Sequence, residues 1–177
     1  MPTETLADLP WAATLSPHPG PLAADMDYDG AHFDGLDLDG PRGASSRFME
    51  CAFTRVTIQD GRFRLARFND VWLSDARLTA TELTETAWTD AIWSGCVAAG
   101  VTMDAAELRR VTLRNCKLDG VNLRGATLID VSFADCLLRD VDFGAATLRR
   151  CTFPGSQLRA ADFSNVTLEQ VDRKSVV

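Results

Sequence analysis

The chain has 177 residues, 24% of them charged, and a formal net charge of −7 at pH 7. This length fits one ordinary domain, and no apolar run approaches the roughly 20 residues that a membrane-spanning helix needs. The N-terminus carries Glu4 and Asp8 and lacks the basic start and apolar core of a signal peptide. These features exclude membrane-spanning and secreted classes, so we expect a cytoplasmic protein that does not bind a membrane.

Residues 1–25 hold five of the seven prolines, and we expect them to form an extended or disordered N-terminal leader. The apolar side chains in this stretch are Leu6, Leu9, Trp11 and Leu15. We expect these four to cover the open end of the repeat domain that follows, because terminal repeats otherwise expose their core and their strand edges.

Residues 26–171 repeat every five positions. From Phe33 to Leu168, every fifth residue forms one register of 28 positions, and 26 of them are Phe, Leu, Ile, Met or Trp. A period of five matches neither the 3.6 residues of a helix nor the two of a strand. The chain must therefore turn a corner every five residues, and self-similarity at a fixed period indicates a solenoid.

The residues on either side of each large side chain complete the repeating unit. Two positions before it, small and β-branched residues dominate, which suggests a second inward-facing side chain. Two positions after it lie eight of the twelve glycines, together with many Asp and Asn residues. These three residue types tolerate positive φ and close tight turns. We predict a unit of small, any, large, any and turn residues.

Val121-Asn122-Leu123-Arg124-Gly125 is a complete copy of a known repeat, and Ala161-Asp162-Phe163-Ser164-Asn165 is a close one. These units resemble the pentapeptide-repeat family. The resemblance implies an all-β fold, a right-handed quadrilateral β-helix with four pentapeptides per coil and about seven coils here. Residues 20 apart would then stack on one side at about 4.8 Å.

Some positions depart from the pattern. Pro41, Gly43 and Ser46 interrupt both inward positions, and we expect a distorted corner at 41–46. Trp88 and Trp93 are oversized, but Ala98 follows in the same coil and should compensate for their volume, since close-packed cores tolerate exchanged volume better than added volume.

The tail, residues 172–177, is too short for a capping helix. Either a second subunit covers the last coil, in a homodimer through the C-terminal coil, or the chain is cut short.

Residues capable of catalysis or metal binding are few. All five cysteines occupy the small inward position, and we expect them to be free structural thiols. Asp25-Met26-Asp27-Tyr28-Asp29-Gly30 matches half of an EF-hand loop, but Leu36 stands where the bidentate Glu belongs. The two histidines are His18, in the leader, and His32, and no phosphate loop or nucleophile motif is present. We expect neither an enzyme nor a metal or cofactor site.

Two groups of residues are candidate partner-binding sites. Trp72 and Ile92 lie 20 apart at outward positions, with Val97 on the next side, and a cluster of exposed apolar groups marks a partner site. Burial against the leader or neighbouring side chains is the alternative explanation. The second group is acidic and belongs to the first coil; it comprises Asp27, Asp29, Asp34, Asp37 and Asp39.

The resemblance also implies a partner. Family members of the fluoroquinolone-resistance type mimic DNA and bind DNA gyrase or topoisomerase IV, without binding nucleic acid themselves. Residues 1–40 contain eight acidic residues and no Lys or Arg, whereas residues 41–177 contain 17 acidic and 18 basic residues. A uniform electrostatic copy of DNA is therefore not supported. The predicted function is a rigid interaction module that acts on a topoisomerase as a partial DNA mimic. The alternative is a generic scaffold with its partner site around Trp72 and Ile92.

Overall fold

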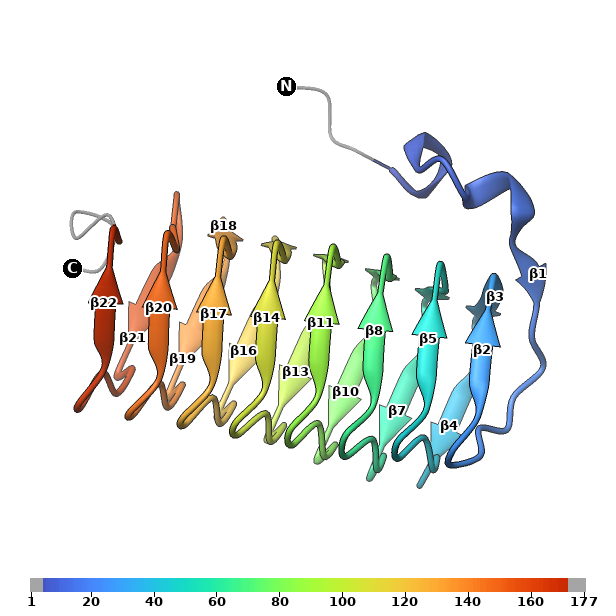
Figure 1. The fold of residues 1–177 in the computed structure, drawn as a ribbon, viewed down its shortest axis with the longest axis horizontal. Helices are drawn as coiled ribbons and strands as arrows, with labels where there is room; N and C mark the ends of the chain where they lie inside the picture. The colour runs from blue at the N-terminus through green and yellow to red at the C-terminus, as the bar shows by residue number, and fades with distance from the viewer. Residues whose placement is uncertain (1–4, 172–177) are drawn as a thin grey trace.

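The computed structural model describes residues 5–171, and from residue 26 onward the chain winds into stacked coils of short parallel strands (Figure 1). The coils follow one another in a nearly straight row and form a rod. Three of its four sides are parallel sheets, which we call sheets A, B and C. The fourth side is joined by isolated bridges between residues 20 apart, such as Arg42 with Arg62 and Asn122 with Asp142. This architecture confirms the predicted quadrilateral β-helix of about seven coils.

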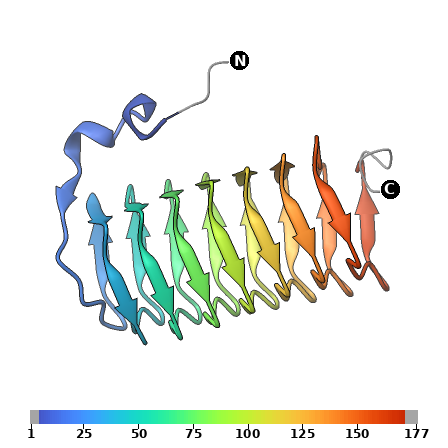
Figure 2. The same ribbon diagram turned by 180° about the vertical axis from the view of Figure 1, so that it is seen from behind.

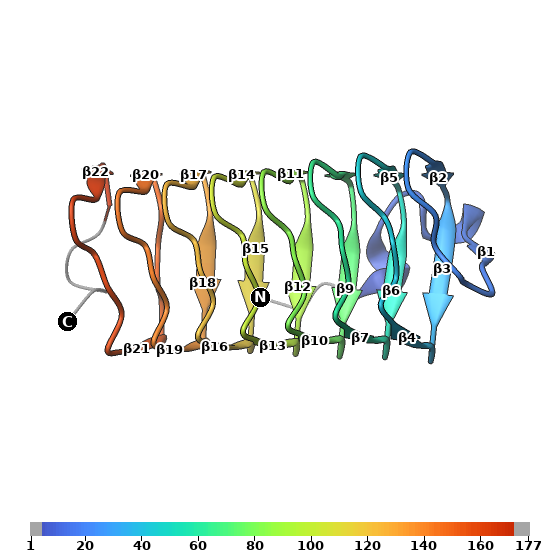
Figure 3. The same cartoon turned by 90° about the horizontal axis from the view of Figure 1, so that it is seen from below.

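Sheet B faces the viewer in Figure 1, sheets B and C lie along opposite sides of the rod in Figure 3, and Figure 2 shows the rod from behind. Sheet A contains β1 (Ser16–Pro17), β3 (Ala31–Asp34), β6 (Ala52–Thr54), β9 (Trp72–Ser74), β12 (Ile92–Ser94), β15 (Thr112–Arg114) and β18 (Ser132–Ala134). Sheet B contains β2 (Asp27–Asp29), β5 (Arg47–Met49), β8 (Arg67–Asn69), β11 (Ala87–Thr89), β14 (Glu107–Arg109), β17 (Thr127–Ile129), β20 (Thr147–Arg149) and β22 (Thr167–Glu169). Sheet C contains β4 (Asp37–Asp39), β7 (Thr57–Gln59), β10 (Arg77–Thr79), β13 (Val97–Ala99), β16 (Lys117–Asp119), β19 (Leu137–Arg139) and β21 (Gln157–Arg159).

The large side chain of each repeat points into the rod and stacks on its equivalents 20 residues away. Along sheet B, the rings of Phe48 and Phe68 are 4.8 Å apart, and those of Phe68 and Trp88 are 3.8 Å apart. Trp93 meets Trp88 edge to face at 5.3 Å, and Ala98 is buried in the same coil. Compensation of the two indoles by the small Ala98 side chain stays a prediction.

The corner positions adopt positive φ, as predicted for their Gly, Asp and Asn residues; Asp60 has φ 51° and Asn115 has φ 53°. Residues that disfavour this conformation adopt it as well, among them Leu65 with φ 61°. The hydrogen bonds between coils therefore impose the turn geometry, and the residue type only makes it easier to reach.

The distorted corner predicted at 41–46 does not occur. Gly43 N–H donates to the Arg62 carbonyl at 2.8 Å, as its counterparts do in later coils. The ring of Phe63 fills the space that a side chain at residue 43 would need. The buried Ser46 hydroxyl donates to the Ala23 carbonyl at 3.0 Å. The Pro41 carbonyl accepts from Arg62 N–H at 2.8 Å, as in a regular coil. The prediction was wrong because each of the three irregular residues has a partner in another coil or in the leader.

The leader contains two short 3₁₀ turns, η1 (Leu6–Asp8) and η2 (Ala12–Thr14), which lie on the outer side of sheet A (Figures 1 and 2). Residues 16–22 cover the end of the first coil. His18 N–H donates to the His32 carbonyl at 2.8 Å, and Leu22 packs into the main core. The end is therefore covered by residues other than the four expected, because β1 pairs with β3 and carries the preceding chain past the end onto sheet A.

Candidate protein-interaction surfaces

The acidic residues of the first coil are distributed over three sides of the rod. Asp27 and Asp29 lie on β2 in sheet B, Asp34 on β3 in sheet A, and Asp37 and Asp39 on β4 in sheet C. All five are exposed, so they form a ring around one end of the rod, not a patch on one side.

Two of these carboxylates have arginine partners in the next coil. The Arg55 guanidinium donates two hydrogen bonds to Asp34, at 2.7 and 2.8 Å, and an Arg47 nitrogen lies 4.0 Å from an Asp27 oxygen. Asp37 and Asp39 stack in register on the neutral residues Thr57 and Gln59. Within this ring, no ion pair of the described chain offsets Asp29, Asp37 or Asp39, and two of these three carboxylates lie on sheet C.

The residues of the half EF-hand motif do not form a calcium loop. Asp27–Asp29 is a strand of sheet B, and its two carboxylates point outward on either side of the buried Tyr28 ring. No three His, Cys, Asp or Glu side chains in the described chain are grouped so that they could hold a metal ion.

Along the rest of the rod, opposite charges pair between adjacent coils. Arg110 donates to both oxygens of Asp90, at 2.6 and 2.8 Å, and Arg150 does the same to Asp130. Hydrogen bonds from these arginines lower the pKa of each aspartate below its ordinary value. Exposed pairs stabilise the fold little, but they neutralise the surface. The same arrangement recurs in the pairs Arg64–Glu85, Arg139–Asp119 and Arg149–Glu169.

Asp70 is an exception among these corner carboxylates. It lies at the corner between sheets B and A, one coil before Asp90. Partial burial, followed by the charge of Asp90, raises the pKa of Asp70 above its ordinary value. Ionised Asp70 is therefore a destabilising group in the folded rod.

The apolar patch predicted around Trp72 is covered by the leader. Trp11 packs on Trp72 and Ala52, and these three residues form a buried cluster in which Trp72 is only 4% exposed. Ile92 packs against the same cluster and stays partly exposed, as does Val97 on sheet C. The exposure expected for Trp72 was wrong, and the alternative explanation, burial against the leader, is correct, because Trp11 covers the Trp72 ring.

The described contact between residues 5–15 and sheet A is apolar packing by Trp11, Leu6, Leu9 and Leu15. In this part of the chain, the backbone hydrogen bonds close within the segment itself, for example from Leu9 N–H to the Leu6 carbonyl at 3.2 Å. Backbone pairing with the rod begins only at Ser16. Trp11 is therefore the main anchor of residues 5–15.

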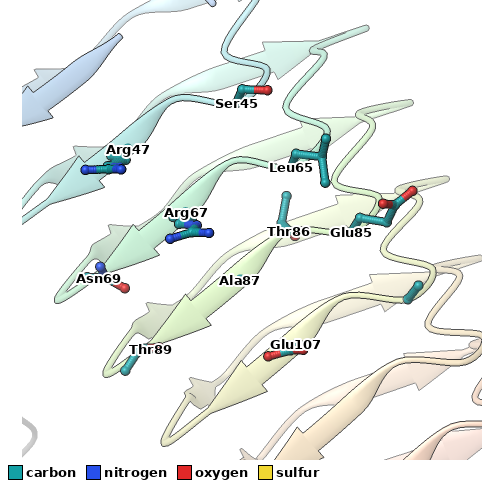
Figure 4. A pocket seen from close by; sticks show the side chains of 11 residues that line it. Ser45, Arg47, Leu65, Arg67, Asn69, Glu85, Thr86, Ala87, Thr89 and Glu107 are labelled. Atoms are coloured by element: carbon teal, nitrogen blue, oxygen red, sulfur yellow. The ribbon is translucent and has the colours of Figure 1, made fainter. Parts of the chain in front are cut away.

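Sheet B carries a surface hollow of about 940 Å³ that the sequence analysis did not identify (Figure 4). Its floor is Ala87, which lies between Arg67 in the coil before and Glu107 in the coil after. The hollow is lined by Ser45, Arg47, Leu65, Arg67, Asn69, Glu85, Thr86, Ala87, Thr89, Ala105 and Glu107. The signal in the sequence was available, because residues 67, 87 and 107 occupy one outward column at a spacing of 20.

The five cysteines are buried and free, as expected. Burial raises the pKa of Cys51 and of Cys151 to about 11. Both groups are therefore neutral thiols near neutral pH and poor nucleophiles.

At the C-terminal end, the last coil exposes part of its core. Leu158, Phe163 and Val166 are partly buried, whereas Leu168 is exposed. Residues 172–177 lie outside the described residues, and the predicted tail falls there. This coil is the location of the predicted homodimer contact.

No helix in residues 5–171 is long and apolar enough to cross a membrane.

No curated protein matches the sequence. Among solved structures, a trypsin-treated variant of QnrB1, a plasmid-mediated fluoroquinolone resistance protein, is 15% identical with a TM-score of 0.38; the alignment covers 85% of this chain and 94% of that one. HetL, a pentapeptide repeat protein involved in heterocyst differentiation regulation from the cyanobacterium Nostoc sp. strain PCC 7120, is 14% identical with a TM-score of 0.24 and coverages of 82% and 89%. Rfr23 from the cyanobacterium Cyanothece 51142 is 18% identical with a TM-score of 0.26 and coverages of 81% and 91%.

The family comparison is more direct. The model described as "Pentapeptide repeat region" matches residues 46–123 and 86–163, which together span well over half of the chain. The two matched segments overlap and keep the five-residue register that the coils show. The chain therefore belongs to the pentapeptide-repeat family.

Proposed function

We propose that this protein is a non-enzymatic interaction module that binds other proteins through the outer surface of its rod. One observation carries the proposal: the inward positions of the coils are filled with packed apolar side chains, which leaves the outward positions for recognition. We also propose that it acts in the cytoplasm.

DNA gyrase or topoisomerase IV is the partner we propose, with the acidic first coil as the contact. Asp37 and Asp39 support this choice because they are exposed and stack on neutral residues. The ion pairs along the remaining coils argue against a continuous row of carboxylates. The proposed mimicry of DNA is therefore partial and is confined to one end of the rod.

A supercoiling assay with gyrase, and a decatenation assay with topoisomerase IV, test this proposal in the presence and absence of a fluoroquinolone. We expect the protein to inhibit the enzyme or to protect it from the drug. The double variant Asp37→Asn/Asp39→Asn should weaken the effect at least tenfold. The matched control, Asp60→Asn/Asp140→Asn, removes two carboxylates from corners further along the rod, where Asn also tolerates positive φ.

A wild-type protein without either effect would refute the topoisomerase proposal and favour the alternative, a generic scaffold with its partner site around Trp72 and Ile92. In the structure the leader covers Trp72, so a partner at this site must displace Trp11. Equal activity of both double variants would refute the acidic contact while leaving the partner in place.

We further propose, as the sequence suggests, a homodimer through the C-terminal coil. Its support is the partial exposure of Phe163 and Leu168 at that end. Sedimentation of Phe163→Asp tests it: the variant should lose the association through this coil, so its average mass should fall below that of the wild-type protein at equal concentration. An unchanged sedimentation coefficient would exclude this contact.

A further inference from the structure

Sheet B presents charges and apolar groups that lack partners in the described chain. No carboxylate of residues 5–171 lies within ion-pair distance of Arg67, although Arg47 stacks on it in register. Like charges placed directly opposite each other are unfavourable. Glu107 has only Arg109, at 3.8 Å. Met49 and Leu65 are 46% and 47% exposed, two of the four large apolar side chains so exposed in the described chain.

The order of the strands determines which residues two copies of sheet B would bring together. A two-fold axis that runs parallel to β11, in front of sheet B, reverses the order of the coils. Each residue keeps its position along the strand, so the first residue of one strand faces the first residue of the opposite strand. The axis therefore places β8 opposite β14, β5 opposite β17 and β2 opposite β20 of a second copy. β11 is the middle strand of the seven that this operation relates, so the axis lies near the centre of the rod (Figure 1).

We propose that sheet B is a self-complementary interface through which two copies of this protein pack face to face and antiparallel about this axis. The central contact is Arg67 with Glu107 of the second copy, formed twice by symmetry. Ala87 meets Ala87 of the second copy at the axis, so the hollow between Arg67 and Glu107 has room for both pairs (Figure 4). The second copy thus supplies a carboxylate for Arg67 and a second arginine for Glu107.

Apolar and peripheral contacts agree with the same arrangement. The exposed Met49 faces Ile129 of the second copy, and the exposed Leu65 enters the part of the hollow lined by Ala105. At the outer strands, Asp29 faces Arg149 of the second copy. Glu85 meets Glu85 of the second copy near the axis, but Arg64 of its own chain neutralises it at 2.7 Å.

The other sides of the rod fit a second copy less well. On sheet C, the same operation about β13 places Arg77 against Lys117 of the second copy. On the fourth side, an axis through Thr102 places Asp104 against its own copy. The same axis places Arg62 and Arg42 opposite Asp142 and Asp162, but both of these aspartates already pair with Arg124 of their own chain. The N-terminal part of sheet A, around Trp72, is covered by the leader. Sheet B is the one side that combines opposite charges with exposed apolar groups.

The interface is small. Seven strands at a spacing of about 4.8 Å span about 29 Å, and three residues at about 3.3 Å each make the strands about 10 Å wide. The strands thus cover about 290 Å², which is below the roughly 800 Å² per partner of standard specific interfaces and is typical of weak, transient contacts. We expect a reversible dimer with a dissociation constant on the order of 10 μM.

Sedimentation equilibrium of the full chain, from 1 to about 300 μM at low salt, tests this interface through a charge exchange. Arg67→Glu and Glu107→Arg should each raise the dissociation constant at least tenfold, because each places like charges opposite one another. An equimolar mixture of the two variants should dimerise again, since each then meets the opposite charge in its partner. Added salt should weaken the wild-type dimer.

Two variants serve as controls. Arg62→Glu reverses an exposed arginine on the adjacent fourth side and should leave dimerisation unchanged. Phe163→Asp removes the C-terminal contact proposed above, so the charge exchange is also measured in this background, where sheet B alone should still form the dimer. A monomeric wild-type protein at about 300 μM would overturn the proposal. So would dimerisation of either single variant at the wild-type affinity, or a mixture that stays monomeric. The inference does not rest on the topoisomerase proposal, because no enzyme is present in this experiment.

Discussion

Replacing Trp11 with alanine should release the leader from sheet A while the rod stays folded. The indole of Trp11 is 7% exposed and packs on Trp72 and Ala52. The described backbone hydrogen bonds of residues 5–15 stay within that segment. The side chain of Trp11 is thus the largest single attachment between this part of the leader and the rod.

The expected size of the effect follows from the buried area. A buried tryptophan covers about 200 Å², which at about 25 cal/mol per Å² corresponds to about 5 kcal/mol. Measured substitutions of buried aromatic residues by alanine cost about 3–5 kcal/mol. Because about 1.4 kcal/mol corresponds to a factor of ten, the docking equilibrium of the segment should shift by at least about 100-fold.

Hydrogen exchange provides the measurement. In Trp11→Ala, amides of residues 5–15 should lose their protection, and the fluorescence of Trp72 should shift to longer wavelength as its ring becomes exposed. Amides of the central strands should keep wild-type protection. Ala13→Ser, a substitution at an exposed position of the same segment, is the matched control. The reasoning would be refuted if protection fell equally along the whole rod, or if residues 5–15 stayed protected.

Further substitutions test the core and the corners. Gly43→Ala should lower the free energy of unfolding by about 1–3 kcal/mol in chemical denaturation, because the new Cβ would clash with the ring of Phe63; unchanged stability would contradict the tight contact. Trp93→Leu should cost about 2–4 kcal/mol in the same measurement by leaving a cavity, and a loss below that range would show that the coils collapse around it. Asp70→Asn should raise the Tm at pH 7 but not at pH 3. Because the pKa of Asp70 is raised in the folded protein, its ionised carboxylate destabilises the fold above that pKa. Below the ordinary value of 3.8 the carboxyl is protonated in both the folded and the unfolded protein and does not change the stability. Asp130→Asn should have the opposite sign: the lowered pKa of Asp130 means that its stabilising effect is present above 3.8 and is lost as the pH falls through the folded-state pKa. Equal shifts for the two variants across pH would rule out this electrostatic explanation.

The coil could be predicted from the sequence because its cause is periodic. A large apolar residue every five positions can be buried only if the chain turns at the same interval, and the structure places Phe63, Leu123 and Phe143 in the interior accordingly. The positive φ of corners such as Asp60 follows from the same period. The column that contains Arg67, Ala87 and Glu107 is also periodic, so the hollow on sheet B was in principle accessible to sequence reasoning.

Contacts between a periodic and a non-periodic segment depended on the tertiary structure. No repeat relates Trp11 to Trp72, and only the path of the leader past β1 brings the two rings together. Gly43 and Ser46 look like defects in the sequence, but Phe63 from the next coil and Ala23 from the leader complete their surroundings. The inward positions were determined by the sequence, because burying them leaves one solution for the backbone. The outward positions were decided by the tertiary structure, since a side chain on the surface acquires its neighbours only when the whole chain has folded.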